Sequence, residues 1–385
     1  MTQGMNRRQF SAGLGLALGA GGLLVGCNKV PDTIRIGVAQ PLSGPLAALG
    51  QDLLNGVRMA VDELHKNGYT VDSKRVQFEV LAQDDRADPA GGRAAAQQLV
   101  EAGVSAVIGH LNSGVSLEAA PIYGEKNIPQ MIISTNPRIT QLGLPTTFRI
   151  VANDALQARA LGSFAASQLA ADAYAVVDDG SPYGKGLADG AAVELEKAKK
   201  TIAVRQGFDD KTTQFAELAA RLKASNVRVI VSMLNDFQSL ALLEELRKLG
   251  HTRVALLGGD LVKTADMIKG MGLIDEIYAT SPVLDVTEFT TGRQFLERYT
   301  AAFQQPPAYG GHYTYDAMYV VSEAIRKAGS AAPADITKAL RGINGYAPVT
   351  GTMAWDEQGE LRYGAVGVYQ MRKGAWELRM RSDRW

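Results

Sequence analysis

The sequence is poor in the residues that build most metal and disulfide sites. Its 385 residues include one cysteine and four histidines. A single cysteine excludes an internal disulfide and every multi-cysteine zinc or iron–sulfur site. The histidines are scattered and form no HExxH pair, which argues against a zinc hydrolase. We therefore expect no metal and no cofactor.

The chain also lacks an excess of either charge. It has 40 Lys+Arg and 40 Asp+Glu, so its formal net charge is zero. Nucleic-acid-binding proteins normally carry a basic excess on one face, so we expect no nucleic-acid partner. The hydrophobic fraction of 46% is ordinary for a soluble globular protein. At roughly 150 residues per domain, the length predicts two domains.

Local enzyme motifs are missing as well. The chain has no GxSxG nucleophile elbow. Gly180–Lys185 lacks the spacing of a phosphate-binding GxxxxGK[ST] loop, and Gly184–Gly190 is one residue too long for GxGxxG. We expect a protein that is not an enzyme. A triad assembled from scattered residues, in an exported hydrolase, is the alternative that spacing does not exclude.

Residues 1–26 are predicted to form a signal peptide. Arg7 and Arg8 precede an uncharged, glycine-rich apolar stretch over Phe10–Val25. This stretch is shorter than the ~20 residues that a membrane-spanning helix needs, which disfavours the alternative of a transmembrane anchor. Asn6–Phe10 resembles a twin-arginine export motif, and the general secretory route is the alternative.

The only cysteine ends this segment. Leu24–Cys27 resembles a bacterial lipobox, in which the cysteine sulfur receives a diacylglyceryl group and the cysteine becomes the mature N-terminus. Cys27 is therefore the predicted lipid attachment site, on a protein of the periplasm or cell surface that several acyl chains hold on a membrane. The alternative is ordinary signal cleavage, which leaves Cys27 as a free thiol.

After the signal peptide, strand and helix patterns alternate. Ile34, Ile36 and Val38 show the two-residue period of a strand, and an amphipathic helix pattern follows. This order predicts an α/β fold with parallel-sheet cores. The pattern restarts after Asn153, which indicates two Rossmann-like lobes.

The two lobes are expected to be joined by a multi-strand hinge rather than by a flexible linker. Extended segments occur near Phe148–Asn153, Tyr278–Asp285 and Thr352–Val366. We assign residues 27–151 plus 283–352 to an N-terminal lobe and 152–282 plus 353–385 to a C-terminal lobe. A cleft between lobes is a favoured ligand site.

Polar residues follow several predicted strands of the first half. Ser113 stands at the start of a predicted helix, and Ser134 and Thr135 follow a strand. Ligands of parallel sheets bind at the carboxyl ends of strands, and a helix N-terminus suits a carboxylate. The alternative for each hydroxyl is a plain helix cap.

The second half contributes an aromatic and an acid. Tyr183 lies in the loop Asp178–Gly184, and Asp260 follows the strand that ends near Gly258. Asp260 is a candidate partner for a cation, and a helix cap is the alternative. Carboxylate binding in one lobe and an acid in the other would suit a zwitterion such as an amino acid.

Eight short motifs occur in a characteristic order and spacing. They are Ser43-Gly44-Pro45, Asp84-Asp85, Ile108-Gly109-His110, Thr135-Asn136-Pro137, Tyr183-Gly184-Lys185-Gly186, Gly258-Gly259-Asp260, Tyr315-Asp316-Ala317 and Trp355-Asp356-Glu357-Gln358-Gly359. Together they resemble the periplasmic leucine/isoleucine/valine-binding proteins, which are type I solute-binding proteins of ABC importers. The resemblance covers the chain from about Thr33 to Tyr369.

The resemblance implies two lobes that close on an amino acid without making or breaking a bond. Ser113, Ser134 and Thr135 would hold the carboxylate and the amino group. Tyr183 would cover the ligand from the opposite lobe, and Asp260 would pair with the ammonium. The protein would be a monomer that delivers its ligand to an ABC permease in the inner membrane. The alternative role is a ligand sensor that signals through a membrane partner.

Two positions depart from the family and leave the ligand open. Leu49 stands where the leucine-binding proteins have a pocket tyrosine, and Asn235 stands where another aromatic is expected. A branched-chain amino acid is the family default. The departures keep a polar amino acid, an amide or another small carboxylic acid as alternatives.

Overall fold

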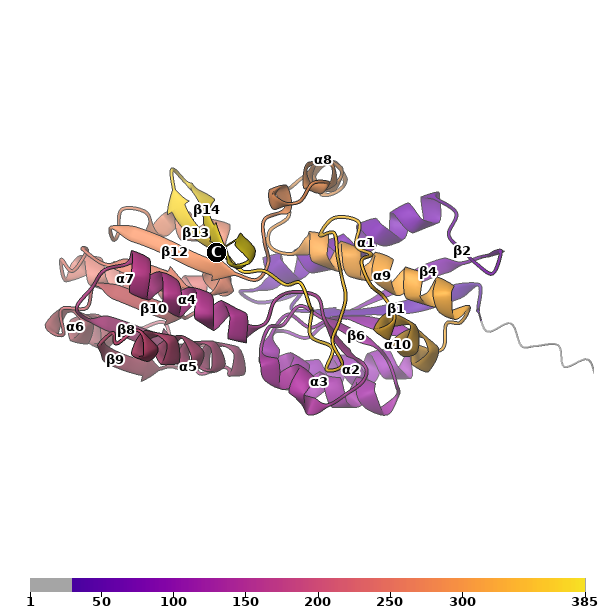
Figure 1. Ribbon diagram of the computed structural model, residues 1–385, viewed down its shortest axis with the longest axis horizontal. Helices are drawn as coiled ribbons and strands as arrows, with labels where there is room; N and C mark the ends of the chain where they lie inside the picture. The colour runs from indigo at the N-terminus through magenta and orange to yellow at the C-terminus, as the bar shows by residue number, and fades with distance from the viewer. Residues whose placement is uncertain (1–29, 385) are drawn as a thin grey trace, which may run out of the picture.

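Two β-sheets with helices packed against them make up the computed structural model (Figure 1), which describes residues 30–384. The predicted signal peptide and Cys27 lie outside the described residues. Within them, no helix is both long enough and apolar enough to cross a bilayer. The predicted α/β fold with parallel-sheet cores is confirmed.

The first lobe is built on a five-stranded sheet in the order β4-β1-β5-β6-β7, with every neighbouring pair parallel. Its strands are β1 (Thr33–Gln40), β4 (Gln77–Asp84), β5 (Ala106–Gly109), β6 (Gln130–Ile132) and β7 (Thr147–Arg149). A small separate hairpin joins β2 (Thr70–Val71) to β3 (Lys74–Arg75).

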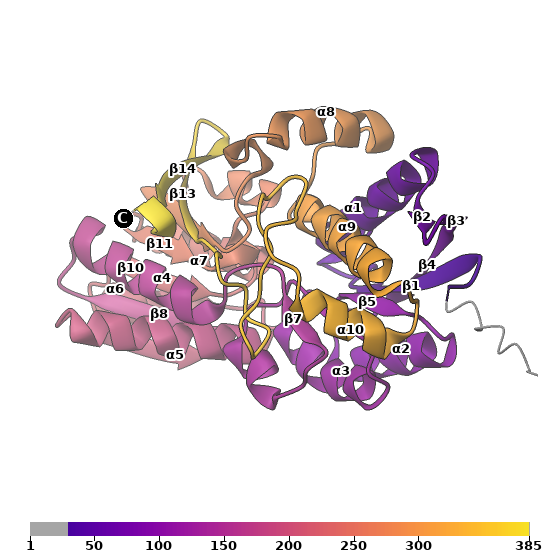
Figure 2. The ribbon, with the colours of Figure 1, turned by 45° about the vertical axis from the view of Figure 1, so that its right-hand side comes forward.

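Helices from two distant parts of the chain cover this sheet. The early helices are α1 (Ala47–Lys66), α2 (Pro89–Glu101) and α3 (Ser113–Glu125), followed by the 3-10 turn η1 (Pro137–Leu142). The late helices are α8 (Gly292–Phe303), α9 (Gly311–Ala328) and α10 (Pro333–Arg341). Figures 1 and 2 both show α9 alongside α1, so the chain returns to complete the first lobe.

The second lobe has a seven-stranded sheet in the order β14-β13-β12-β11-β10-β8-β9. Its parallel strands are β8 (Tyr174–Asp178), β9 (Ile202–Gly207), β10 (Val229–Met233), β11 (Ala255–Gly258) and β12 (Glu276–Ser281). Its helices are α4 (Asp154–Gln168), α5 (Pro182–Lys197), α6 (Ala216–Ala224) and α7 (Asp236–Lys248). Short 3-10 turns, η2 (Asp260–Val262), η3 (Ala265–Gly270) and η4 (Val286–Glu288), follow β11 and β12.

The edge of the second sheet differs from the parallel pattern. β13 (Gly367–Arg372) and β14 (Ala375–Arg381) form an antiparallel hairpin that extends the sheet beyond β12, and η5 (Ser382–Arg384) follows. A tight connection through Lys373 and Gly374, both with positive φ, makes the antiparallel turn. The sequence pattern alone did not reveal these two strands.

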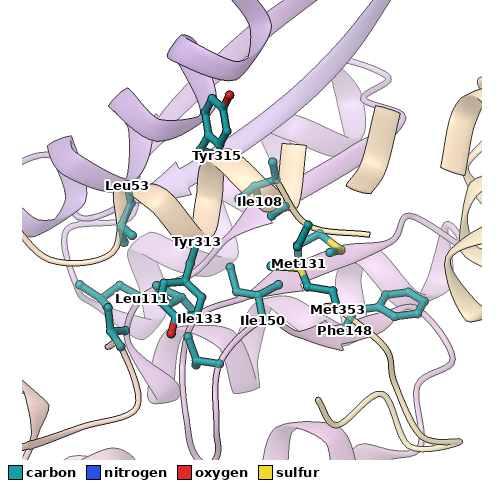
Figure 3. Packing of buried hydrophobic residues seen from close by; sticks show 14 of the residues in the cluster. Leu53, Ile108, Leu111, Met131, Ile133, Phe148, Ile150, Tyr313, Tyr315 and Met353 are labelled. Carbon is teal, nitrogen blue, oxygen red and sulfur yellow. The ribbon is translucent and has the colours of Figure 1, made fainter. Parts of the chain in front are cut away.

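The core of the first lobe lies between its sheet and the α1–α9 pair. Strand residues Ile108, Met131 and Phe148 pack there against helix residues such as Leu53 and Tyr315 (Figure 3). β5 and β6 are buried along their whole length, as expected for strands with helices on both faces. Such a core fixes the ends of the strands and the loops that follow them.

Three connections join the two sheets, after β7, after β12 and before β13. Residues from all three line a cavity of about 250 Å³, among them Val151, Pro282 and Gly364. Residues 353–361, which the sequence-based assignment places in the second lobe, contact the first: the Trp355 Nε1–H donates to the Arg149 carbonyl over 2.7 Å.

A buried ion pair ties this last connection to the first sheet. The Arg149 side chain is fully buried, and its Nε and Nη2 both donate to the Glu360 carboxylate over 2.9 Å. Nη2 also donates to the Asn136 carbonyl over 2.9 Å, and Nη1 donates to the Ser134 carbonyl. Burial alone would raise the pKa of Glu360, but the Arg149 guanidinium holds it below its usual value.

Removing one partner of this pair should leave a buried charge without compensation. We expect Arg149→Met to lower the free energy of unfolding by about 3–5 kcal/mol, and Glu360→Gln to be destabilising as well. The double variant should lose clearly less free energy of unfolding than the sum of the two single losses, because neither charge is then buried without its partner. Urea unfolding of all four proteins measures this, and additive effects would contradict the pairing.

A second buried group, Asp154, begins α4 next to the hinge. It is 3% exposed, and neither carboxylate oxygen has a hydrogen-bond partner within residues 30–384. Burial raises its pKa to about 7. Because the folded state then binds the proton more tightly than the unfolded chain, the stability that Asp154 contributes is lost as the pH rises from about 4 to about 7.

Asp154→Asn should therefore stabilise the protein at pH 8 by about 1–3 kcal/mol, the usual penalty of a buried group without a partner. The gain should shrink toward zero at pH 4, where Asp154 is protonated in the folded state. Chemical denaturation at both pH values measures it, with the exposed Asp172→Asn as control. An equal gain at pH 4 and pH 8 would refute ionisation as the cause.

Candidate ligand-binding site

A cavity of about 720 Å³ lies between the carboxyl edges of the two sheets. The first lobe contributes the loops that follow β1, β4, β5 and β6, and the second contributes those that follow β8, β9, β10 and β11. These are the strand ends at which parallel sheets bind ligands. The cavity is therefore built from both lobes.

Five of the seven predicted ligand-binding residues line this cavity. They are Ser113, Thr135, Tyr183, Asn235 and Asp260. The first two come from the first lobe and the other three from the second. The structure thus brings together side chains that are up to 147 positions apart (260 − 113).

The other two predicted residues, Ser134 and Leu49, point elsewhere. The Ser134 hydroxyl is buried and forms a 2.7 Å hydrogen bond with the Ser116 hydroxyl. Leu49 faces the core of the first lobe from α1, and Leu46, just before that helix, lines the cavity in its place. Neither Ser134 nor Leu49 contributes its side chain to the cavity wall.

The N-terminus of α3 supplies an anion-binding feature. Ser113, Gly114 and Val115, the first three residues of this 13-residue helix, all line the cavity. First-turn N–H groups have no partner inside a helix, and the helix dipole adds partial positive charge there. Thr135 lies beside this turn, because the Asn136 N–H donates to the Ser113 Oγ over 3.3 Å. Together they can hold a carboxylate.

Asp260 is the acid of the opposite lobe, and three side chains orient it. Its Oδ1 accepts hydrogen bonds from the Tyr183 hydroxyl at 2.6 Å and from Gln157 Nε2 at 3.1 Å. Its Oδ2 accepts one from the Tyr309 hydroxyl at 2.7 Å. A carboxylate has about four acceptor positions, so one remains for a ligand.

The two tyrosines hold the Asp260 carboxylate in place as hydrogen-bond donors. Burial and the neighbouring Asp260 charge raise the pKa of both Tyr183 and Tyr309 well above the usual value, so their hydroxyls stay protonated and donate. Gly259 allows the close approach, because a Cβ there would lie 2.3 Å from the Tyr183 hydroxyl oxygen. The acid is thus preorganised to face a cation.

Tyr309 and Gln157 are site residues that the sequence analysis missed. Tyr309 precedes α9 in the first lobe, so its bond to Asp260 crosses the cleft. Gln157 is in the first turns of α4 and is fully buried. Neither follows a predicted strand, so the rule that located Asp260 and Ser113 did not select them. The Gly310-Gly311 pair after Tyr309 was the only local signal.

The lobes also touch directly beside the cavity. The Asn136 Nδ2 donates to the Pro182 carbonyl over 2.6 Å. A Cβ added at Gly114 would lie 3.2 Å from the Pro182 ring, so the N-termini of α3 and α5 almost meet. One wall of the cavity is therefore formed where these helix ends approach each other.

The described lining of the cavity contains no histidine or cysteine. The buried His110 pairs its Nδ1 with the Asp85 carboxylate at 2.7 Å, but its Nε2 faces the Tyr123 hydroxyl, and no serine completes a triad. Asp84 accepts the N–H groups of Leu42 and Arg86, which is loop capping. Within residues 30–384, no His/Cys/Asp/Glu group has a metal-binding arrangement.

Known proteins share this architecture over nearly the whole chain. A protein of Pseudomonas aeruginosa, the leucine-, isoleucine-, valine-, threonine-, and alanine-binding protein, is 29% identical over 350 residues, covering 90% of this chain and 92% of its own. The crystal structure of a leucine-binding protein from Thermotoga maritima matches with a TM-score of 0.82 at 23% identity, covering 91% of this chain and all of the other.

A solute-binding protein of an ABC transporter from R. palustris, solved with benzoate, has the same fold, with a TM-score of 0.79, 15% identity, and coverage of 91% of this chain and 96% of its own. The family model described as periplasmic binding protein matches residues 33–375. The chain thus belongs to the periplasmic binding protein family, and its resemblance to the leucine/isoleucine/valine-binding proteins is confirmed.

Proposed function

We propose that this protein is an extracytoplasmic solute receptor that closes around an amino acid and delivers it to an ABC importer. One observation supports this most strongly: the α3 N-terminus and Asp260 face the same cavity from opposite lobes. The first suits a carboxylate and the second an ammonium. A free amino acid carries both groups on one carbon atom.

In this proposal the ligand carboxylate binds the first-turn N–H groups of α3 and the hydroxyls of Ser113 and Thr135. Its ammonium binds the open position on Asp260. A ligand that touches both lobes stabilises the closed state, and the hinge carries the motion. Apolar neighbours such as Leu111, Ile133 and Leu261 would contact the side chain.

An aromatic carboxylic acid is the second ligand class, since a structural relative holds benzoate. Such a ligand would occupy the α3 end equally well. It has no ammonium, however, and Asp260, almost fully buried, would face no cation. The acid therefore favours an amino acid over a benzoate.

In the proposal the role is transport rather than sensing, because the R. palustris relative is described as a solute-binding protein of an ABC transporter. The family is extracytoplasmic, which agrees with the predicted signal peptide. Stimulation of a reconstituted ABC permease from the same genome by the loaded protein would separate delivery from signalling. In the proposal the protein acts as a monomer and without a cofactor, metal or catalytic step.

Ligand binding should depend on the Asp260 charge. We expect at least one of the 20 amino acids to raise the melting temperature, because it binds only the folded state. Asp260→Asn should lower the affinity for that ligand about 10–100-fold, as expected when a charge-assisted hydrogen bond is lost. Isothermal titration calorimetry measures the change.

The exposed Asp266→Asn is the matched control and should bind like wild type. The panel also includes small amides and benzoates. If only a benzoate binds, and Asp260→Asn does not change its affinity, then the ligand is an aromatic acid and not an amino acid. If none of the compounds in the panel binds, the proposed function is overturned.

Membrane attachment through Cys27 is the second part of the proposal. We expect the full chain, expressed in a lipoprotein-processing bacterium, to fractionate with the membrane. Cys27→Ala should release it into the soluble fraction, because the acyl chains have no attachment point. Mass spectrometry of the N-terminal peptide should detect the diacylglyceryl group. A variant that stays on the membrane would instead favour an uncleaved transmembrane anchor.

A further inference from the structure

The cavity continues past Asp260 along the carboxyl edge of the second sheet. The neighbouring strands β11, β10 and β8 are followed by Asp260, Asn235 and Asp179, and all three residues line the cavity. Adjacent strands are about 4.8 Å apart, which places the ends of β11 and β8 roughly 10 Å apart. A second polar region therefore lies beyond the ammonium position.

Asp179 has an acceptor that is nearly unused. The residue is 3% exposed. Its Oδ1 accepts the Ser181 N–H at 3.0 Å and the Ser181 hydroxyl at 2.6 Å. Its Oδ2 accepts only a long 3.4 Å hydrogen bond from Asn235 Nδ2. Burying a carboxylate oxygen with so little compensation is costly, so a donor from a ligand would be favourable there.

Asn235 provides the second acceptor. It begins α7 in a capping-box arrangement with Gln238, whose Oε1 accepts the Asn235 N–H at 3.1 Å. The residue is 7% exposed, and its Oδ1 faces the Gln238 N–H of the capping box but accepts no hydrogen bond of ordinary geometry within residues 30–384, which leaves it able to accept one from a ligand. Asp179 and Asn235 thus present acceptor oxygens to the same region of the cavity.

The charge around this region is negative. Besides Asp179 and Asp260, the lining includes the acids Asp88, Asp209 and Asp210, against the cations Arg86 and Lys211. A cavity whose walls have a low dielectric constant and carry charges mainly of one sign favours a ligand group of the opposite charge. The acceptors therefore suit a positively charged donor better than a neutral one.

The space between the two acids suits a short carbon chain. Phe237, two residues after Asn235, lines the cavity and can pack against methylene groups, and Phe208, after β9, lines it beyond Asp179. The strand ends that carry the two acids are roughly 10 Å apart, a distance of the same order as a basic amino acid that is hydrogen-bonded at both its α-ammonium and its side-chain end.

We propose that Asp179 and Asn235 form a subsite for a cationic side-chain end, so that the preferred ligand is a basic amino acid such as lysine, ornithine or arginine. The ligand ammonium or guanidinium donates to Asp179 Oδ2 and Asn235 Oδ1, while Asp260 binds the α-ammonium. This inference rests on the proposed function and specifies the side chain that the site selects.

The test compares lysine with norleucine, which has the same carbon chain without the terminal ammonium, by isothermal titration calorimetry. We expect wild type to bind lysine at least 10-fold more tightly than norleucine. Asp179→Asn keeps the acceptor that binds Ser181 but removes the charge. This variant should lower the affinity for lysine about 10–100-fold and change the affinity for norleucine less than twofold.

A second variant keeps the test decisive if Asp179→Asn folds poorly. Asn235→Ser retains a helix-capping oxygen and removes the amide, so it should lower the lysine-to-norleucine preference. Asp266→Asn, an exposed acid outside the cavity, should leave the preference unchanged. Wild type that binds norleucine as tightly as lysine, or an Asp179→Asn variant that weakens both equally, would overturn the subsite.

Failure of the subsite and failure of the proposed function give different results. Binding of leucine or norleucine without preference for lysine overturns the subsite and leaves the amino-acid receptor standing. Absence of binding for every amino acid overturns both.

Discussion

The buried guanidinium of Arg149 connects the hinge with the ligand cavity. It donates to the carbonyls of Ser134 and Asn136, on either side of Thr135, and pairs with Glu360 in the last connection between the lobes. A fully buried charged side chain is tolerated only when its N–H donors are hydrogen-bonded, so all these partners must keep their positions around the guanidinium. The position of Thr135 beside the α3 N-terminus follows from that constraint.

Across the cavity, buried acids determine the chemistry of the second lobe. Asp260 is held by tyrosines from both lobes, so one carboxylate belongs to the binding site and to the contact between lobes. Asp154 lies nearby with no hydrogen-bond partner of ordinary geometry among residues 30–384, and burial, with the Asp260 charge, raises its pKa despite the opposing effect of the Thr135 hydroxyl. This concentration of negative charge favours a cationic group on the ligand and costs stability when the cavity is empty.

The rules applied to local sequence predicted several of the loops that line the cavity, but not the direction of every side chain in them. The rule that ligands bind after strand ends located Ser113, Tyr183 and Asp260. It did not separate Ser134 from Thr135, since neighbours in an extended segment point to opposite sides and only packing decides which side faces the cavity. The antiparallel β13–β14 edge was missed although Trp376, Leu378 and Met380 alternate with charged residues after the Lys373-Gly374 turn, which is a hairpin signal; only the pairing with β12 required the tertiary structure.

By itself, the sequence determined the α/β class, the division into two lobes, the family resemblance and the strand ends that face the cleft, because hydrophobic period and turn residues act over short stretches. Only the tertiary structure decided which distant groups meet. Tyr309 is 49 positions from Asp260, and Arg149 is 211 from Glu360. Such pairs depend on how the chain crosses between lobes, and no local pattern encodes them. The acceptors on Asp179 and Asn235 became visible in the same way, when β8 and β10 were placed side by side.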